Sequence, residues 1–128
     1  MTTEVVTCDI NKSLKEINDQ FAENNIRHIP ITSNGKLVGI MSQTDILRIS
    51  FGHAFDDENQ DTDDAIFDML SINQVMKHSP VTVSPQQEIR IAAELLMKKE
   101  FHALPVVDNE KLVGIVTTTD IIKYFLDN

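Results

Sequence analysis

The sequence predicts an α/β (α+β) fold in which two β-α-β-β-α repeats pack around a pseudo-twofold axis. The first observation behind this prediction is an internal repeat: residues 34–40 (NGKLVGI) return as residues 109–115 (NEKLVGI), at an offset of 75. The second observation is that each copy alternates short β-branched runs with stretches of helical periodicity. Because a unit of about 50 residues buries little surface alone, we expect the copies to pack together and to leave two related clefts.

The first half of each copy predicts a strand followed by a helix. In copy two, the β-branched run 81–83 is closed by the turn signal Ser84-Pro85. Copy one begins its helix with Ser13-x-x-Glu16, which is typical of a capping box. Both helices carry apolar residues at helical spacing, namely Leu14, Ile17 and Phe21 in copy one, and Ile89, Ala92, Ala93, Leu96 and Met97 in copy two.

The second half of each copy predicts a hairpin followed by another helix. Strands are expected at 29–32 and 37–41 in copy one. In copy two, the counterpart of the strand 29–32 is expected at 104–107. Asn34-Gly35 favours a tight two-residue turn, whereas Asn109-Glu110 predicts a longer or different turn. Each copy should form a three-stranded sheet with two helices on one face. The last helix carries Ile46, Leu47 and Ile49 in copy one, and Ile121, Ile122 and Phe125 in copy two.

The repeat divides the chain into residues 1–50, an acidic linker with the start of a connecting helix at 51–70, and residues 71–128. The stretch 72–76 has no counterpart before copy one, so we expect the first repeat to lack its N-terminal helical turn. A helix is expected around Asp64–Met76, with its inward residues at Ala65, Ile66, Met69 and Leu70.

Seven of the 20 acidic residues lie between Asp56 and Asp68, inside this linker. The pattern Asp57-x-Asn59-x-Asp61-x-Asp63 imitates the start of a calcium-binding loop. However, Thr62 stands where that loop requires Gly, and no bidentate Glu closes it. We therefore interpret the segment as a solvated linker and expect no metal site.

The composition excludes several classes of function. A net charge of −9 argues against DNA or RNA as a partner, because nucleic-acid binding depends on Lys and Arg near phosphates. The longest apolar runs last about five residues, against about 20 for a membrane span. The N-terminus does not have the pattern of a signal peptide. A single cysteine, Cys8, forms no internal disulfide, so we expect a cytoplasmic protein with Cys8 as a small buried apolar residue.

The most specific motif is Ser42-x-x-Asp45 after an apolar strand, repeated as Thr117-x-x-Asp120. Such a motif is typical of a helix N-cap with an acidic residue in the first turn. The same geometry suits a ligand, because free backbone N–H groups attract phosphate and a carboxylate can accept hydrogen bonds from a ribose diol. The spacing alone leaves both interpretations open.

Taken in this order, the motifs resemble a pair of cystathionine-β-synthase (CBS) domains, the Bateman module, over nearly the whole chain. In copy one the resemblance rests on residues 6–7, 27–31, 37–40 and 42–45. In copy two it rests on residues 81–83, 102–106, 112–115 and 117–120.

The resemblance implies an adenosyl ligand in the clefts: AMP, ADP or ATP, with S-adenosylmethionine or NAD as alternatives. Asp45 and Asp120 would bind ribose hydroxyls, and the first strands would present backbone to the adenine edge, with Ile29 and Leu104 against the ring. No cofactor is required. The implied ligand-binding positions are Thr7, Cys8, Arg27, His28, Ile29, Pro30, Ser42, Thr44 and Asp45 in copy one, and Thr82, Val83, His102, Ala103, Leu104, Pro105, Thr117, Thr119 and Asp120 in copy two.

In the family, basic residues just before the second strand often meet phosphates. Arg27 and His28 hold these positions in copy one, and His102 and Ala103 hold them in copy two. An alternative for Arg27 is a surface side chain whose aliphatic part covers the strand. Ala103 departs from the family pattern, so a phosphate-bearing ligand is expected nearer Arg27.

Three functional hypotheses follow. The leading one is a regulatory, ligand-sensing module without catalysis, which passes its signal to an unidentified effector protein or through self-association. The second is a structural or dimerising module with empty clefts. The least favoured is an enzyme, because the sequence has no phosphate-binding glycine loop and no credible nucleophile–base pair. The resemblance also implies a disc-like homodimer through the helices, with Leu47, Phe125 and Leu126 as candidate interface residues.

Overall fold

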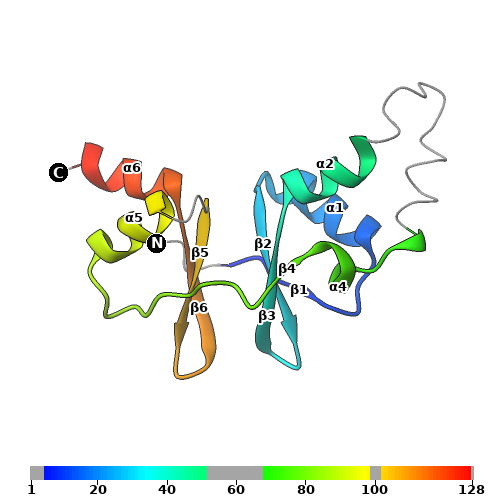
Figure 1. Cartoon of the computed structure of the whole chain (residues 1–128), viewed down its shortest axis with the longest axis horizontal. Helices are drawn as coiled ribbons and strands as arrows, with labels where there is room; N and C mark the ends of the chain where they lie inside the picture. Colours follow the sequence, from blue (N-terminus) through cyan, green and yellow to red (C-terminus); the bar gives the residue numbers. More distant parts are fainter. Residues whose placement is uncertain (1–4, 52–67, 99–101, 128) are drawn as a thin grey trace. The chain divides into compact units, whose positions relative to one another are not determined.

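A hairpin with helices on one side forms the centre of each of two structural units (Figure 1). The computed structural model describes residues 5–51, 68–98 and 102–127, without the side chains of residues 50 and 51. The first unit contains copy one and consists of Val6–Asn34 and Val38–Ser79. The second unit contains copy two and is built chiefly from Pro80–Asn128. The calcium-like residues 57–63 and the predicted inward residues Ala65 and Ile66 lie outside the described residues.

The sheet of the first unit has four strands in the order β1-β2-β3-β4, one more than the sequence predicted. These are β1 (Cys8–Asp9), β2 (His28–Ser33), β3 (Lys36–Ser42) and β4 (Lys77–His78). β1 is parallel to β2, as expected for a strand–helix–strand connection. β4 is antiparallel to β3, with Gly39 opposite His78. β4 consists only of Lys77 and His78, which are both exposed and polar. The alternation of apolar and polar residues that predicts a strand is therefore absent here.

Helix α1 (Leu14–Asn24) begins with the predicted capping box and buries the predicted apolar residues. Its Ser13 side chain accepts a hydrogen bond from the Glu16 N–H, and the Ser13 N–H donates to the Glu16 carboxylate. Helix α2 (Gln43–Phe51) follows β3 directly. In Figure 1 these helices lie on one side of the sheet. Together they cover a core that includes Leu14, Ile17, Phe21, Ile29, Ile31, Met41 and Ile46.

The connecting helix predicted around Asp64–Met76 is interrupted before it reaches Met76. Asp68 and Met69 are helical, the backbone bends at Leu70, and the short helix α4 (Ile72–Val75) then begins. Ser71 and Gln74 form a capping box there, which gives the backbone a new helix start in place of a continuous helix. Met69 is consequently 80% exposed rather than inward, and Ile72 is buried in its place.

The second unit repeats the first with the same offset of 75 between its hairpin strands. Strands β5 (Ala103–Asp108) and β6 (Lys111–Thr117) form an antiparallel hairpin. The helices are α5 (Ile89–Lys98) and α6 (Thr118–Leu126). The strand expected at 81–83 is reduced to one parallel bridge between Val83 and Val106, the counterpart of the Cys8–Ile31 pair. The core contains Val83, Ala92, Leu96, Leu104, Val106, Val116 and Ile121.

The turn of the second hairpin is not longer than that of the first, contrary to expectation. Asn109 and Glu110 form a two-residue turn with φ of 50° and 68°, which matches Asn34 and Gly35 at 52° and 79°. A non-glycine residue in the left-handed region costs roughly 1–2 kcal/mol. The paired strands on both sides hold Glu110 in this conformation, because a longer loop would disturb the ladder from Ala103–Thr117 to Asp108–Lys111.

Within the described residues, no helix combines the length and apolar character needed to span a membrane.

Candidate functional site

Two equivalent strand-to-helix junctions contain the predicted Ser/Thr-x-x-Asp motif, one in each unit. At the first junction, the Asp45 N–H donates to Ser42 Oγ at 3.0 Å, and the Ser42 N–H donates to Asp45 Oδ2 at 3.0 Å. At the second junction, the Asp120 N–H donates to Thr117 Oγ1 at 3.2 Å, and the Thr117 N–H donates to Asp120 Oδ2 at 2.9 Å. Both motifs are therefore reciprocal helix caps, as one of the two interpretations predicted.

The cap leaves one oxygen of each carboxylate without a capping hydrogen bond. An ionised carboxylate offers about four lone-pair positions on two oxygens, and each cap occupies Oδ2 only. Asp45 Oδ1 lies 3.7 Å from Nη1 of Arg48, whose side chain is 71% exposed. This long, exposed ion pair contributes little to stability. Capping and ribose binding are thus compatible functions of the same aspartate.

A second hydrogen bond ties each junction to the residue before its second strand. The Gln43 N–H donates to the Arg27 carbonyl at 2.8 Å, and the Thr118 N–H donates to the His102 carbonyl at 3.1 Å. The hydroxyl of Thr118 also donates to the His102 carbonyl, at 3.4 Å. The basic residue is thereby held beside the N-terminal end of the helix, where the helix dipole favours an anion. Sequence reasoning did not predict this bond, because a backbone contact leaves no side-chain signature.

The predicted site residues differ in how far they are exposed. Arg27 and His102 are exposed, His28 is half-buried, and Ala103 is buried at the start of β5. Thr7 and Thr82 on the first strands, and Thr44 and Thr119 in the helix starts, are also exposed. Asp45 is buried, at 6% exposure, whereas Asp120 is half-buried.

The strand residues predicted to contact adenine mostly pack inward. Ile29 and Leu104 are fully buried in the cores of their own units. Because side chains alternate along a strand, Pro30 and Pro105 point to the opposite face of the sheet from Ile29 and Leu104. Ring contact by Ile29 and Leu104 stays a prediction.

Cys8 contributes its side chain to the core of the first unit, together with Ile31 opposite it on β2. The pKa of the Cys8 thiol is raised from 9.0 to about 11, chiefly by burial, with smaller contributions from Glu16 and Asp9 that Lys12 opposes. The thiol is therefore neutral near pH 7, which makes it a poor nucleophile. Cys8 is the buried apolar residue that the sequence predicted, and a ligand would meet its backbone rather than its sulfur.

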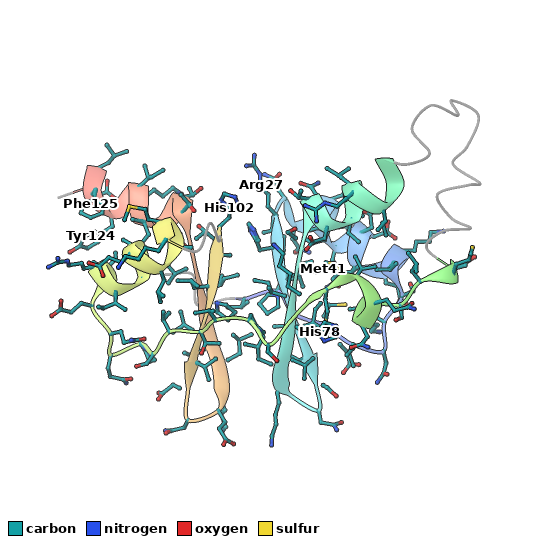
Figure 2. All side chains as sticks on the ribbon, viewed as in Figure 1. Arg27, Met41, His78, His102, Tyr124 and Phe125 are labelled. Atoms are coloured by element: carbon teal, nitrogen blue, oxygen red, sulfur yellow. The ribbon has the colours of Figure 1, made fainter. Side chains whose placement is uncertain are left out.

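A groove of about 500 Å³ lies beside the second junction, between α5 and α6. His102 and Thr118 supply its polar lining, and the remaining lining is apolar, from Ala93, Leu96, Met97, Ile121 and Ile122. Figure 2 shows His102 at the end of β5 beside the helices of this unit. The sequence predicted His102 as a ligand-binding residue but gave no indication of this groove.

Across residues 5–51, 68–98 and 102–127, no group of three or more His, Cys, Asp and Glu side chains is placed to hold a metal ion. The chemistry that the junctions offer is hydrogen bonding to hydroxyls and, beside Arg27, attraction of an anion.

Comparison with known proteins identifies the repeat. The CBS domain family profile matches residues 1–52 and 72–127. Protein MJ1225 from Methanocaldococcus jannaschii is 28% identical over 126 residues, which cover 98% of this chain and 45% of that protein. Its crystal structure superposes with a TM-score of 0.82 at 27% identity. Protein MJ1232 from the same organism is 35% identical over 121 residues, covering 94% of this chain and 36% of that protein.

A third comparison concerns a structure with ligands. The CBS domain pair of protein MJ0100, in complex with 5′-methylthioadenosine and S-adenosyl-L-methionine, matches with a TM-score of 0.75 and 27% identity. The match covers 97% of this chain and 93% of that one. The present chain therefore has the α+β fold of a CBS domain pair, and it spans less than half the length of the curated relatives MJ1225 and MJ1232. Some other relatives are named as enzymes, and the chain corresponds to 22% or 32% of their length.

Proposed function

The chain belongs to the CBS domain family, and from this premise we propose that it is a non-catalytic regulatory module that binds an adenosine nucleotide or S-adenosylmethionine. The observation that carries the proposal is the duplicated junction. In both units, one carboxylate caps a helix with Oδ2 and keeps Oδ1 outside the cap. A ribose diol supplies the two O–H donors that such an oxygen can accept.

In the proposed complex, the two aspartate motifs bind the ribose of the ligand and the strands bind its base. Asp45 and Asp120 accept hydrogen bonds from ribose hydroxyls, with Ser42 and Thr117 beside them. The backbone around Thr7-Cys8 and Thr82-Val83 faces the adenine edge, next to Ile29-Pro30 and Leu104-Pro105. Thr44 and Thr119 are exposed in the first turns of α2 and α6, and their hydroxyl groups add polar contacts at the edge of the proposed site.

The phosphate end of the ligand should lie at the first junction. Arg27 is exposed, and its carbonyl accepts a hydrogen bond from the first N–H of α2, so its backbone is held beside a helix N-terminus, within side-chain reach of an anion bound there. Half-buried His28 follows it. The second junction has His102 and the buried Ala103 instead, which leaves one side chain rather than two that could contact a phosphate. We therefore expect AMP, ADP or ATP at the first junction, and S-adenosylmethionine or NAD as alternatives that depend less on Arg27.

The 5′-methylthioadenosine and S-adenosylmethionine bound by the MJ0100 domain pair support an adenosyl ligand in general. Regulation would follow if the ligand prefers one arrangement of the units or of two chains, because a ligand shifts only the equilibria in which it distinguishes the states. We expect a homodimer, an unidentified effector protein as the receiver of the signal, and a cytoplasmic location.

A thermal-shift titration with AMP, ADP, ATP, NAD and S-adenosylmethionine tests the proposal. A ligand at a hundredfold its Kd should add ~2.7 kcal/mol of apparent stability. Asp45→Asn and Asp120→Asn keep an oxygen for the cap but lose the charge, and each should weaken the binding at its own junction by about tenfold, the value of one lost hydrogen bond to a charged group.

Ser13→Ala is the matched control for this titration. It removes the hydroxyl of the cap of α1 in the same unit, costs about 1 kcal/mol of stability, and leaves both junctions in place. Its ligand shift should stay close to that of the wild type. If no adenosyl compound raises the melting temperature, the module is structural and the proposal fails. If binding survives both asparagine substitutions unchanged, the ribose assignment is wrong.

A further inference from the structure

The tip of the first hairpin contains the one place in the sequence where an asparagine precedes a glycine. Asn34 and Gly35 connect β2 to β3, and both are exposed. Both lie in the left-handed region, with φ of 52° and 79°. The second hairpin has an exposed two-residue turn with similar φ values at Asn109 and Glu110. The two turns therefore present the same residue type in a similar conformation and differ in the residue that follows it.

An asparagine side chain is open to attack by the backbone nitrogen of the next residue. In this step the bond from that nitrogen to Cγ forms, the attacking amide loses its proton, and the side-chain nitrogen leaves as ammonia. The product is a five-membered succinimide ring. Water then opens the ring: hydrolysis at Cγ gives aspartate, and hydrolysis at the backbone carbonyl carbon gives isoaspartate. Water is the only co-reactant, and no oxidant or reductant takes part.

Gly35 leaves room for this attack on Asn34. A side chain on the attacking residue would crowd its nitrogen as the ring closes, and glycine has none. A Cβ built at Gly35 meets no atom within 4 Å, so the space around the turn is open as well. Within the described residues, no hydrogen bond holds the Asn34 side chain in place. The Asn34 side chain is thus free to rotate toward the Gly35 nitrogen.

The second turn provides a control within the same molecule. Glu110 carries a Cβ and an acidic side chain on the nitrogen side of Asn109, in a turn of the same length. Every other asparagine that has a following residue also precedes a residue with a side chain. Asn34 is therefore the asparagine of this sequence with the least hindered neighbour.

The two products of the reaction affect the hairpin differently. Aspartate followed by glycine also suits a two-residue turn, so this product keeps the hairpin and makes the net charge of −9 more negative. Isoaspartate adds one carbon to the backbone of the turn, which separates the strand ends that a two-residue loop holds together. The ligand-binding junction is at the opposite end of the hairpin, where the Gln43 N–H donates to the Arg27 carbonyl (Figure 1). Isoaspartate should therefore destabilise the first unit more than it disturbs the junction.

We propose that Asn34 is a site of spontaneous deamidation, at which the backbone nitrogen of Gly35 converts the hairpin tip into a mixture of aspartate and isoaspartate. The reaction needs no enzyme. Its rate rises with pH, because the attacking amide must lose its proton. The inference goes beyond the proposed function and does not depend on any ligand.

Incubation of the full chain at physiological temperature and mildly alkaline pH, followed by peptide mass spectrometry, tests the proposal. Asn34 should deamidate at least about tenfold faster than Asn109, which corresponds to a barrier lower by roughly 1.4 kcal/mol. Glu110→Gly creates the same pair in the second turn, and it should bring Asn109 to within about threefold of the rate at Asn34. Gly35→Glu is the reciprocal variant and should slow Asn34 to the rate of Asn109.

Equal rates at the two asparagines of the wild type would overturn the proposal. So would an unchanged rate at Asn109 in Glu110→Gly, or deamidation of Asn34 in urea but not in the native chain. Because Glu110→Gly relieves a left-handed glutamate, this variant keeps the test valid even where Gly35→Glu disturbs the fold. None of these measurements includes a nucleotide, so their outcomes are independent of whether any adenosyl compound binds.

A second measurement compares the two products. Ion exchange separates the deamidated chains, and electron-transfer fragmentation distinguishes isoaspartate from aspartate. The isoaspartate fraction should melt at least about 4 °C below the wild type, whereas Asn34→Asp should melt within about 1 °C of it. An isoaspartate fraction that melts with Asn34→Asp would contradict the predicted effect on the turn.

Discussion

The two units contain the same hairpin and the same hydrogen-bonded junction but differ in several features around them. The first unit has a fourth strand, a buried aspartate, an exposed arginine beside the helix start and a thiol in its core. The second has a single-bridge first strand, a half-buried aspartate, a buried alanine and an apolar groove. A duplicated motif has thus kept the atoms that cap a helix start, while the residues around it have diverged. Under the proposed function, this difference means that the first unit provides the basic side chain for a phosphate-bearing ligand.

The largest expected effect concerns Cys8, whose counterpart in the second unit is Val83. Because burial raises the pKa of the Cys8 thiol from 9.0 to about 11, the native protein holds about 100-fold less thiolate at pH 8 than the unfolded chain. Alkylation by iodoacetamide, followed by mass spectrometry, should be at least that much slower in native protein than in urea. Equal rates in the two states would show that the first strand does not bury Cys8.

The same shift in pKa makes stability depend on pH in a defined window. Folding disfavours the thiolate, so the contribution of Cys8 to stability is fully present below pH 9 and is lost as the pH rises toward 11. A Cys8→Val variant carries the residue that the second unit has at this position. It should lose less stability than the wild type as the pH rises from 9 toward 11.

Gly39 is the next test, because it is where β4 makes the first unit different from the second. A Cβ at this position would lie 2.9 Å from the Lys77 carbonyl and would also meet the sulfur of Met76. Gly39→Ala should therefore cost about 2 kcal/mol of unfolding free energy in urea denaturation, since the backbone of β4 must move. Hydrogen exchange should accelerate at Ser79, whose N–H donates to the Val38 carbonyl. A variant with wild-type stability would mean that β4 contributes little to the first unit.

The smallest effect concerns the two hairpin turns. Glu110 stands in the left-handed region where the first hairpin has Gly35. Glu110→Gly should stabilise the chain by about 1 kcal/mol, because it removes the steric cost of that conformation. Gly35→Ala should destabilise it by a similar amount, although no atom lies within 4 Å of the added Cβ. Thermal melts of the two variants should move in opposite directions, and shifts of the same sign would contradict the account of the turns.

The sequence was sufficient for the elements whose signals are local. The capping box at Ser13 and the two Ser/Thr-x-x-Asp junctions are short-range hydrogen-bond patterns, and the structure contains all three. The repeat predicted the second unit from the first, and the hairpin strands obey the offset of 75.

Features that depend on tertiary pairing were missed or mispredicted. β4 exists because β3 offers it an edge, and the turn at Asn109-Glu110 is imposed by the ladder rather than by turn preference. The helix expected through Met76 gave way to a cap at Ser71, although Ser71-x-x-Gln74 was visible as a local signal. In the site, the bonds from Gln43 to Arg27 and from Thr118 to His102 involve backbone atoms, which no residue pattern encodes.

An adenosine phosphate bound at the first junction is the central element of the proposed function. The decisive measurement is isothermal titration calorimetry of AMP and of adenosine with the wild type, Arg27→Ala and His102→Ala. A charge-assisted contact to phosphate is worth about 1.5–3 kcal/mol, so Arg27→Ala should weaken AMP binding at least tenfold and leave adenosine unchanged, and His102→Ala should have a smaller effect on AMP. Absence of AMP binding to the wild type, or equal weakening of AMP and adenosine by Arg27→Ala, would contradict it.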